Sequence, residues 1–223
     1  MKGMSVKQAV LGAILASVAA FGPPSMAVAD DMSWKHEGTA PEGKVTVGFR
    51  AGMAINTQEI VDNSDTSLGP AINFQATYGV NKWFNVGMML TWQRLSIDVQ
   101  QPKTDLATLN TVTLLPVYLE YRPGHWGKLQ PYLSTGIGVN INSTSEADAF
   151  KRAGTTFSAG NTFAWRNAGG LDYQLTQHFV LNAEFAVNRN RGSIETKQGG
   201  RVISTDPFDA SSMNILFGAK FIF

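Results

Sequence analysis

Cysteine is absent from the 223 residues, and this absence excludes two common sources of structure in exported proteins. Without thiols the chain forms no disulfide bridge and no thiolate metal site. Long apolar runs are also missing after the first 30 residues, so nothing there reaches the roughly 18 residues of a transmembrane helix. If the protein spans a membrane, it does so as a closed β-barrel, which pairs its backbone polar groups internally.

The N-terminus has the pattern of a secretory signal peptide. Lys2 and Lys7 precede an apolar stretch at 9–21, and a Pro-Pro break leads to Ala27-Val28-Ala29. A transmembrane anchor is the alternative, but the stretch is shorter than the roughly 20 residues such an anchor needs, and no basic flank follows it. We therefore predict cleavage after Ala29.

Neither sign of charge dominates the sequence. The chain has 18 basic and 17 acidic residues, and loss of Lys2 and Lys7 leaves a mature charge near −1. No cluster of Lys or Arg gives a local positive patch, so a nucleic-acid partner is not expected.

The main signal in the mature chain is a period of two, which indicates β-strands. It recurs in segments of about 10 to 12 residues, the length of a tilted transmembrane strand. In the first, Val45, Val47 and Phe49 alternate with Thr46 and Arg50. The eight segments lie near 44–55, 72–80, 84–99, 115–122, 133–141, 161–173, 179–188 and 214–223.

Two segments have local features. In the third segment the alternation changes phase at Arg94, and Leu95, Ile97 and Val99 continue the apolar row. A bulge or an exit of the strand from the membrane would explain this change. In the fourth we expect Leu115 to face outward.

The connections between segments alternate in length. Those at 56–69, 100–109, 143–159 and 192–210 are long, and the turns between them are shorter. Outer-membrane barrels combine short periplasmic turns with long external loops. We predict an all-β, eight-stranded antiparallel transmembrane barrel with up-and-down topology and both termini in the periplasm. The predicted parts are a signal peptide at 1–29, a periplasmic N-terminal extension at 30–43 and the barrel at 44–223.

A soluble β-sandwich also has alternating strands. Its polar face would meet water and be rich in Lys and Glu, whereas the polar rows here contain mainly Asn, Gln, Thr, Ser and Gly. A helical reading would need apolar residues at i and i+3 or i+4, which these segments lack.

The order of the motifs resembles the OmpW family of small outer-membrane barrels. The resemblance rests on 114–117, Tyr121, the stretch 130–140, Ala168 to Tyr173, Asp206-Pro207 and the closing 217–223. It covers essentially the whole mature chain. It departs from the family at the end, where Lys220-Phe221-Ile222-Phe223 replaces the usual Tyr-Arg-Phe.

We expect no catalysis, because the three histidines, His36, His125 and His178, all map to the periplasmic end, away from the outer rim where a lipid hydrolase would need its base. No cofactor is expected. Two pairs of loop aspartates, Asp62 with Asp65 and Asp206 with Asp209, could hold a hard cation, but such residues more often form turns, and we predict no metal site.

Seven charged residues are predicted to point into the lumen, four basic and three acidic. An eight-stranded barrel is just wide enough for its side chains to fill it. The charges would then pair with each other and close the lumen; the functional alternative is a narrow selective passage. The seven are Arg50, Glu120, Arg122, Arg166, Asp172, Glu184 and Lys220.

Pro116 lies inside the fourth segment, where it cannot donate to the strand ladder, so we expect a gap or bulge there. The resemblance to the OmpW family implies a hydrophobic pocket that opens sideways toward the membrane and takes small apolar molecules. We would place it at Pro116 with Met89, Leu95, Leu114 and Tyr118. The alternative is a rim bulge with no role in transport.

We expect a monomer in the outer membrane of a Gram-negative bacterium. Its predicted partners are the membrane lipid and lipopolysaccharide, small hydrophobic solutes, and the barrel-assembly machinery, which would bind the C-terminal strand ending in Phe223. The expected function is passive passage or binding of small hydrophobic molecules. The competing function is a structural or adhesive surface barrel with a closed lumen and external loops that contact host or phage.

Overall fold

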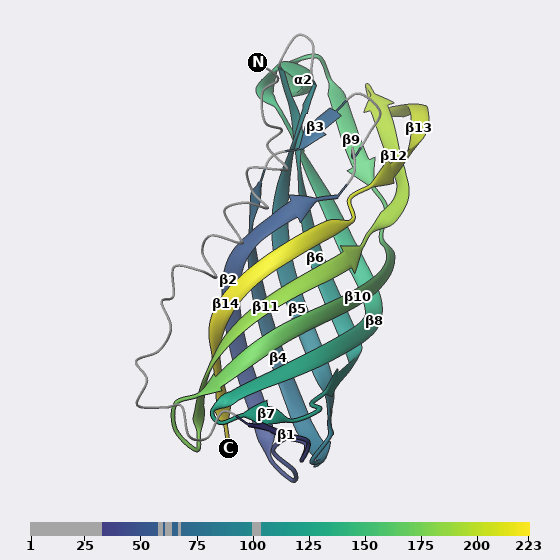
Figure 1. Ribbon diagram of the computed structural model, residues 1–223. Coiled ribbons are helices and arrows are strands. Elements are labelled where there is room, and N and C mark those ends of the chain that lie inside the picture. The colour runs from purple at the N-terminus through teal and green to yellow at the C-terminus, as the bar shows by residue number, and fades with distance from the viewer. Residues whose placement is uncertain (1–32, 58–59, 61–63, 67, 100–103) are drawn as a thin grey trace, which may run out of the picture.

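Eight long antiparallel strands form a closed barrel in the computed structural model, which describes residues 33–57, 60, 64–66, 68–99 and 104–223 (Figure 1). The fold class predicted from the alternation is therefore confirmed. The barrel strands are β2 (Val45–Asn56), β4 (Gly69–Asn81), β5 (Phe84–Val99), β6 (Thr104–Tyr121), β8 (Leu129–Glu146), β10 (Thr162–Gln174), β11 (Phe179–Arg189) and β14 (Ser212–Ile222).

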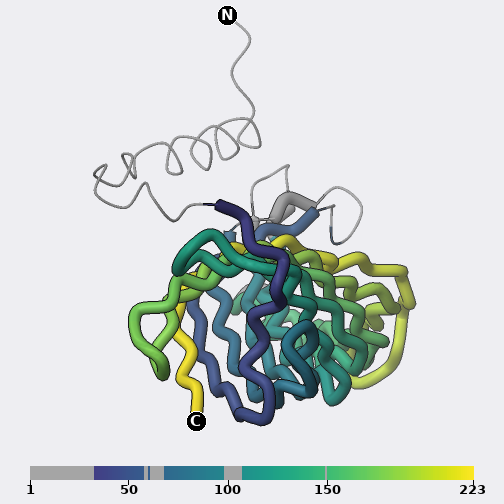
Figure 2. The backbone as a smooth tube through the Cα atoms, turned by 60° about the horizontal axis from the view of Figure 1, so that its bottom comes forward, coloured from purple at the N-terminus to yellow at the C-terminus, as the bar shows by residue number. Residues whose placement is uncertain are grey.

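Each barrel strand pairs with the next barrel strand in the sequence, and β14 returns to β2 to close the ring. Figure 2, tilted so that the bottom comes forward, shows this ring. The closing pair runs from Ser212 opposite Asn56 to Ile222 opposite Thr46. A closed ring has no free barrel edge, so every strand can pair on both sides within hydrocarbon.

Side chains alternate between the lumen and the outer surface. On β11 Phe185 is 47% exposed whereas its neighbour Glu184 is 3% exposed. The outward rows are mostly Val, Leu, Ile, Phe and Met, and the inward rows are mostly polar. This is the inverse of a soluble protein and is typical of a barrel surrounded by lipid.

Strand β6 contains a bulge at Pro116, as expected from the missing N–H group of proline. The register with β8 shifts between Leu114 and Val117, and the register with β5 shifts at the same place. Pro116 and Val117 are both exposed, so the alternation changes phase there and Leu115 faces inward. The expectation that Leu115 faces outward is wrong for this reason.

The side chains of strand β5 keep a single phase from Phe84 to Ile97. Arg94 is exposed on the outer face, and Leu95 and Ile97 are buried on the same inward row as Gln93. No register shift lies at Arg94, so the expected bulge is absent there, and Leu95 and Ile97 do not continue the outward row. The apolar residues beyond Arg94 fill the barrel interior instead of facing lipid.

Strands β5, β6 and β8 contain 16, 18 and 18 residues, more than a bilayer requires. Strand β3 (Ser64–Thr66) extends the sheet beside β5. A separate three-stranded sheet and the short helix α2 (Asp148–Arg152) lie at the same end of the barrel as β3 (Figure 1). The strands of this sheet are β9 (Thr155–Ala159), β12 (Arg191–Gln198) and β13 (Arg201–Asp209). We call this end the outer end. The long connections predicted here are thus partly strands.

The opposite end, called the inner end, carries the tight turns and the C-terminus (Figure 1). Asn81 caps one turn by accepting hydrogen bonds from the backbone N–H groups of Trp83 and Phe84. The short strands β1 (Trp34–Lys35) and β7 (His125–Trp126) pair here. No helix in the described ranges is long and apolar enough to cross a membrane.

Candidate functional site

All seven charged residues predicted to point inward lie inside the barrel, on β2, β6, β10, β11 and β14, or directly after β6 in the case of Arg122. Each is at most 4% exposed. We call these seven residues the charged cluster.

The charged cluster divides into two groups of ion pairs. In one, Glu184 pairs with Arg50 and with Arg166, whose Nη2 lies 2.6 Å from the Glu184 Oε1 atom. In the other, Arg122 lies 2.5 Å from Asp172 and 2.7 Å from Glu120. Lys220 completes the second group, with its Nζ 2.9 Å from Asp172 and 3.4 Å from Glu120.

Tyr132 joins the two groups. Its hydroxyl donates to Glu184 at 2.7 Å, and the Lys220 ammonium lies 4.1 Å from the centre of its ring. The amides of Asn85 and Asn182 donate to Glu120 at 2.9 Å and to Asp172 at 2.6 Å. The carboxylates thus have both cationic and neutral donors, which is the condition under which charges are tolerated in a low-dielectric interior.

Farther along the lumen, uncharged side chains bond to each other between neighbouring strands and across the lumen. Thr113 donates to Asn140 at 2.7 Å, and Asn190 donates to Asn142 at 2.8 Å. No site was predicted at these residues, although the Asn, Gln, Thr and Ser of the polar rows in the sequence are their signal. We call the set the polar belt: Asn73, Thr91, Gln93, Thr111, Thr113, Asn140, Asn142, Thr162, Asn190, Ser212 and Asn214.

Apolar side chains fill the outer part of the interior. On β5 the inward row passes from Gln93 to Leu95 and Ile97, and on β6 it passes from Thr111 to Leu109. We call the whole group the outer apolar cluster: Ala54, Ile60, Ala71, Leu95, Ile97, Leu109, Ala159, Ile194, Phe208, Ala210 and Leu216.

The five residues predicted to form a hydrophobic pocket are divided among three places. Met89 and Tyr118 lie inside the barrel with Leu115 and Ala164, next to the β6 bulge. Leu95 belongs to the outer apolar cluster. Leu114 and Pro116 are exposed on the outer surface, because they alternate along β6 with the inward Thr113 and Leu115.

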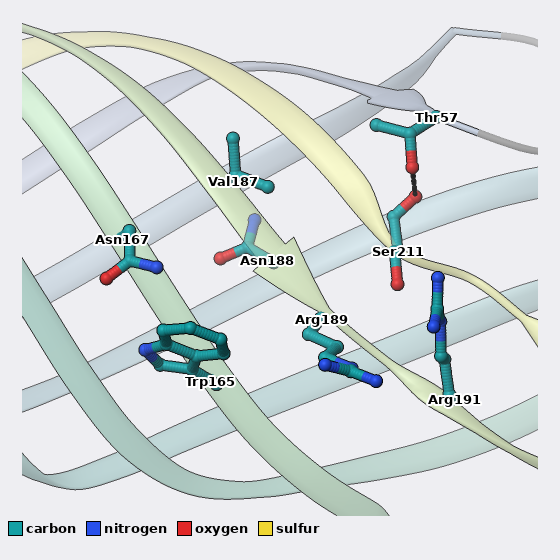
Figure 3. A pocket seen from close by; sticks show the side chains of 8 residues that line it. All are labelled: Thr57, Trp165, Asn167, Val187, Asn188, Arg189, Arg191 and Ser211. Atoms are coloured by element: carbon teal, nitrogen blue, oxygen red, sulfur yellow. Dashed lines mark hydrogen bonds between the residues drawn. The ribbon is translucent and has the colours of Figure 1, made fainter.

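A pocket of about 230 Å³ opens in the barrel wall near the outer end (Figure 3). We call it the wall pocket, and no sequence motif indicated it. It is lined by Thr57, Trp165, Asn167, Val187, Asn188, Arg189, Arg191 and Ser211.

Asp209 lies beside this pocket on β13 and accepts a hydrogen bond from Arg191 at 2.6 Å. Partial burial acts to raise the pKa of this carboxyl, but hydrogen bonds from Ser211 and Arg191 outweigh it and lower the pKa below its usual value. Asp209 therefore stays ionised at neutral pH.

Metal binding has no support in the described part of the chain, where no group of three His, Asp or Glu lies close enough to hold an ion. Asp62 lies outside the described residues. His125 and His178 lie at the inner end, where the ring of His178 stacks on Phe221, and His36 stands next to Trp83.

The description "Outer membrane protein beta-barrel domain" belongs to a family model that matches residues 13–221. The chain belongs to this family. The family places the barrel in the outer membrane. The short turns at the inner end are of the kind that such barrels have on the periplasmic side. A comparison with curated proteins gives no match.

The solved outer-membrane barrels OprG and AlkL share the fold. The crystal structure of OprG from Pseudomonas aeruginosa has a TM-score of 0.65 at 15% identity, over 85% of this chain and 99% of that one. AlkL in lipid bilayers has a TM-score of 0.54 at 15% identity, over 85% and 93%. The Escherichia coli outer membrane protein W has a TM-score of 0.46 at 19% identity, over 85% and 100%. Membership of the OmpW family in particular stays a prediction.

Proposed function

We propose that this outer-membrane barrel binds small apolar molecules in its outer half and releases them sideways into the membrane, without an aqueous path to the periplasm. One observation carries the proposal: the interior is apolar at the outer end and filled by paired charges at the inner end. Ions and hydrophilic solutes would have to break the charged cluster to pass. An apolar molecule would meet no charged group between the outer apolar cluster and a gap in the wall, only the uncharged side chains of the polar belt.

The bulge in β6 supplies a candidate for that gap. The strand ladder shifts on both sides of Pro116, which lies between two lipid-facing leucines, Leu114 and Leu119. Behind it lie the inward Met89 and Leu115. Apolar groups therefore stand on both sides of the wall at this point. The predicted likeness to the OmpW family points in the same direction.

We expect the substitution Pro116→Thr to reduce uptake of an apolar solute severalfold, because threonine restores the missing donor and favours a regular strand. The measurement is the entry rate of the fluorescent probe N-phenylnaphthylamine into vesicles with a lipopolysaccharide outer leaflet. Pro70→Thr is the matched control, since Pro70 is an exposed strand proline with no register shift beside it.

Single-channel recording in planar bilayers should show no conductance steps for the wild type. Resolved steps would contradict a closed inner end. Uptake equal in protein-containing and protein-free vesicles would contradict apolar passage and favour the second candidate, a structural or adhesive surface barrel. A specific observation favours that candidate too: Val202 and Ile203 on the outermost strand β13 are 51% and 60% exposed, which suits contact with a partner.

A further inference from the structure

The wall pocket lies where the outward apolar rows of three adjacent strands end. The row of β11 passes from Phe185 and Val187 to Arg189. On β14 and β2 the last apolar residues of these rows are Met213 and Ile55. The next positions are Ser211, just before β14, and Thr57, just after β2. The Thr57 hydroxyl donates a hydrogen bond to the backbone carbonyl of Ser211. Because apolar rows mark the hydrocarbon and polar residues mark its boundary, the pocket sits at the level of the outer-leaflet headgroups.

Two guanidinium groups line this pocket from the outer face. Arg189 and Arg191 are exposed, while Asn190 between them is buried, so the strand alternation points both arginines away from the lumen. Arg191 is already paired with Asp209. The guanidinium of Arg189 has no ion pair or hydrogen bond with any described group, and its backbone carbonyl accepts one, from Asn140. The three charges sum to +1, and Arg189 carries the uncompensated one.

The pocket also has an apolar wall. Trp165 and Val187 are each 44% exposed on the lipid-facing surface of β10 and β11. Figure 3 shows the indole of Trp165 beside Arg189, with Asn167 on the far side of the ring from Arg191. The Asn167 side chain accepts a hydrogen bond from Thr135 through its oxygen, and its NH₂ group donates to no described partner. An occupant would thus meet cationic, amide and apolar surfaces together.

We infer that the wall pocket binds a phosphorylated lipid of the outer leaflet, with a phosphate on Arg189 and Arg191 and an acyl chain along Trp165 and Val187. A guanidinium binds a phosphate through two parallel hydrogen bonds, a geometry that a compact cation without a planar fork of donors cannot provide. The adjoining hydrocarbon lowers the dielectric around this contact. A soluble anion would meet the charge but would leave the apolar wall exposed to lipid.

The test uses the purified full-length barrel in zwitterionic detergent and fluorescent bis-phosphorylated lipid A as the probe. We expect saturable binding that weakens at high salt and a loss of about tenfold in affinity for Arg189→Gln, the worth of one charge-assisted contact. Removal of both phosphates from lipid A should cause a similar loss in the wild type. Inorganic phosphate at the same concentration should compete poorly.

Arg94→Gln is the matched control, because Arg94 is another exposed arginine at the outer end of an apolar row, on β5, away from this pocket. Heat-modified migration in gel electrophoresis verifies that each variant is folded. Equal affinities for wild type and Arg189→Gln would overturn the inference, and so would an equal loss in Arg94→Gln. Full competition by inorganic phosphate would overturn the lipid as the occupant.

Discussion

Replacing Glu184 by glutamine should lower the free energy of unfolding by about 3 to 5 kcal/mol, the range found when one partner of a buried ion pair is removed. Glutamine keeps the shape of the side chain, so the packing of β11 is unchanged. The loss of its charge leaves Arg50 and Arg166, which are 0% and 1% exposed, without the carboxylate that both of them contact. Urea unfolding of the barrel in phospholipid vesicles, followed by tryptophan fluorescence, measures the effect.

Glu195→Gln is the control for this substitution. Glu195 pairs with Lys197 on the external sheet, where its side chain is 44% exposed, and such pairs contribute little. The double variant Glu184→Gln, Arg166→Met should recover part of the lost stability, because one of the two uncompensated cations is gone. An unfolding midpoint for Glu184→Gln equal to that of Glu195→Gln would show that the charged cluster does not hold the inner end together.

The charged cluster has two effects in this barrel: it joins the strands, and it fills the inner end of the lumen. The same contacts that join β2, β6, β10, β11 and β14 across the lumen also occupy the volume a solute would use. Conduction through the inner end would require breaking several buried pairs at once, at a cost far above thermal energy. A role at the outer end or at the lipid-facing wall avoids this cost.

The alternation in the sequence was sufficient to predict the barrel, because one physical rule, lipid outside and polar side chains inside, acts on every strand. The same rule identified all seven members of the charged cluster. It could not identify their partners: Lys220 on β14 and Asp172 on β10 are 48 residues apart, and they meet inside the barrel because the sheet curves around the lumen.

Errors in the prediction arose where the environment along a strand changes. Leu95 and Ile97 lie where β5 extends past the membrane, so their apolar character fits the interior and not lipid. Leu115 was misplaced because a bulge after it reverses the phase. The wall pocket is lined by residues on or next to β2, β10, β11 and β14 and by one residue of β12. Such a set cannot be identified from the sequence before the register of the strands is known.

Substitution of Gly170, which lies against the Tyr132 ring, should destabilise the barrel to an extent similar to the loss of a buried ion pair. A Cβ atom added to Gly170 would stand 2.3 Å from Cζ of the Tyr132 ring, closer than such atoms approach each other. In Gly170→Ala the ring must therefore move, and its hydrogen bond to Glu184 and its contact with Lys220 are lost. We expect a loss of about 2 to 4 kcal/mol, the combined cost of overpacking and of an unsatisfied buried group.

The neighbouring glycine provides the control, because a Cβ added to Gly169 meets nothing nearer than 3.6 Å. Gly169→Ala should unfold within about 0.5 kcal/mol of the wild type in the same urea assay. In a Tyr132→Ser background Gly170→Ala should lose most of its effect, since the obstructing ring is absent. If Gly170→Ala were equally destabilising with and without the ring, the cost would lie in the backbone of β10, and Tyr132 would not be the residue that Gly170 accommodates.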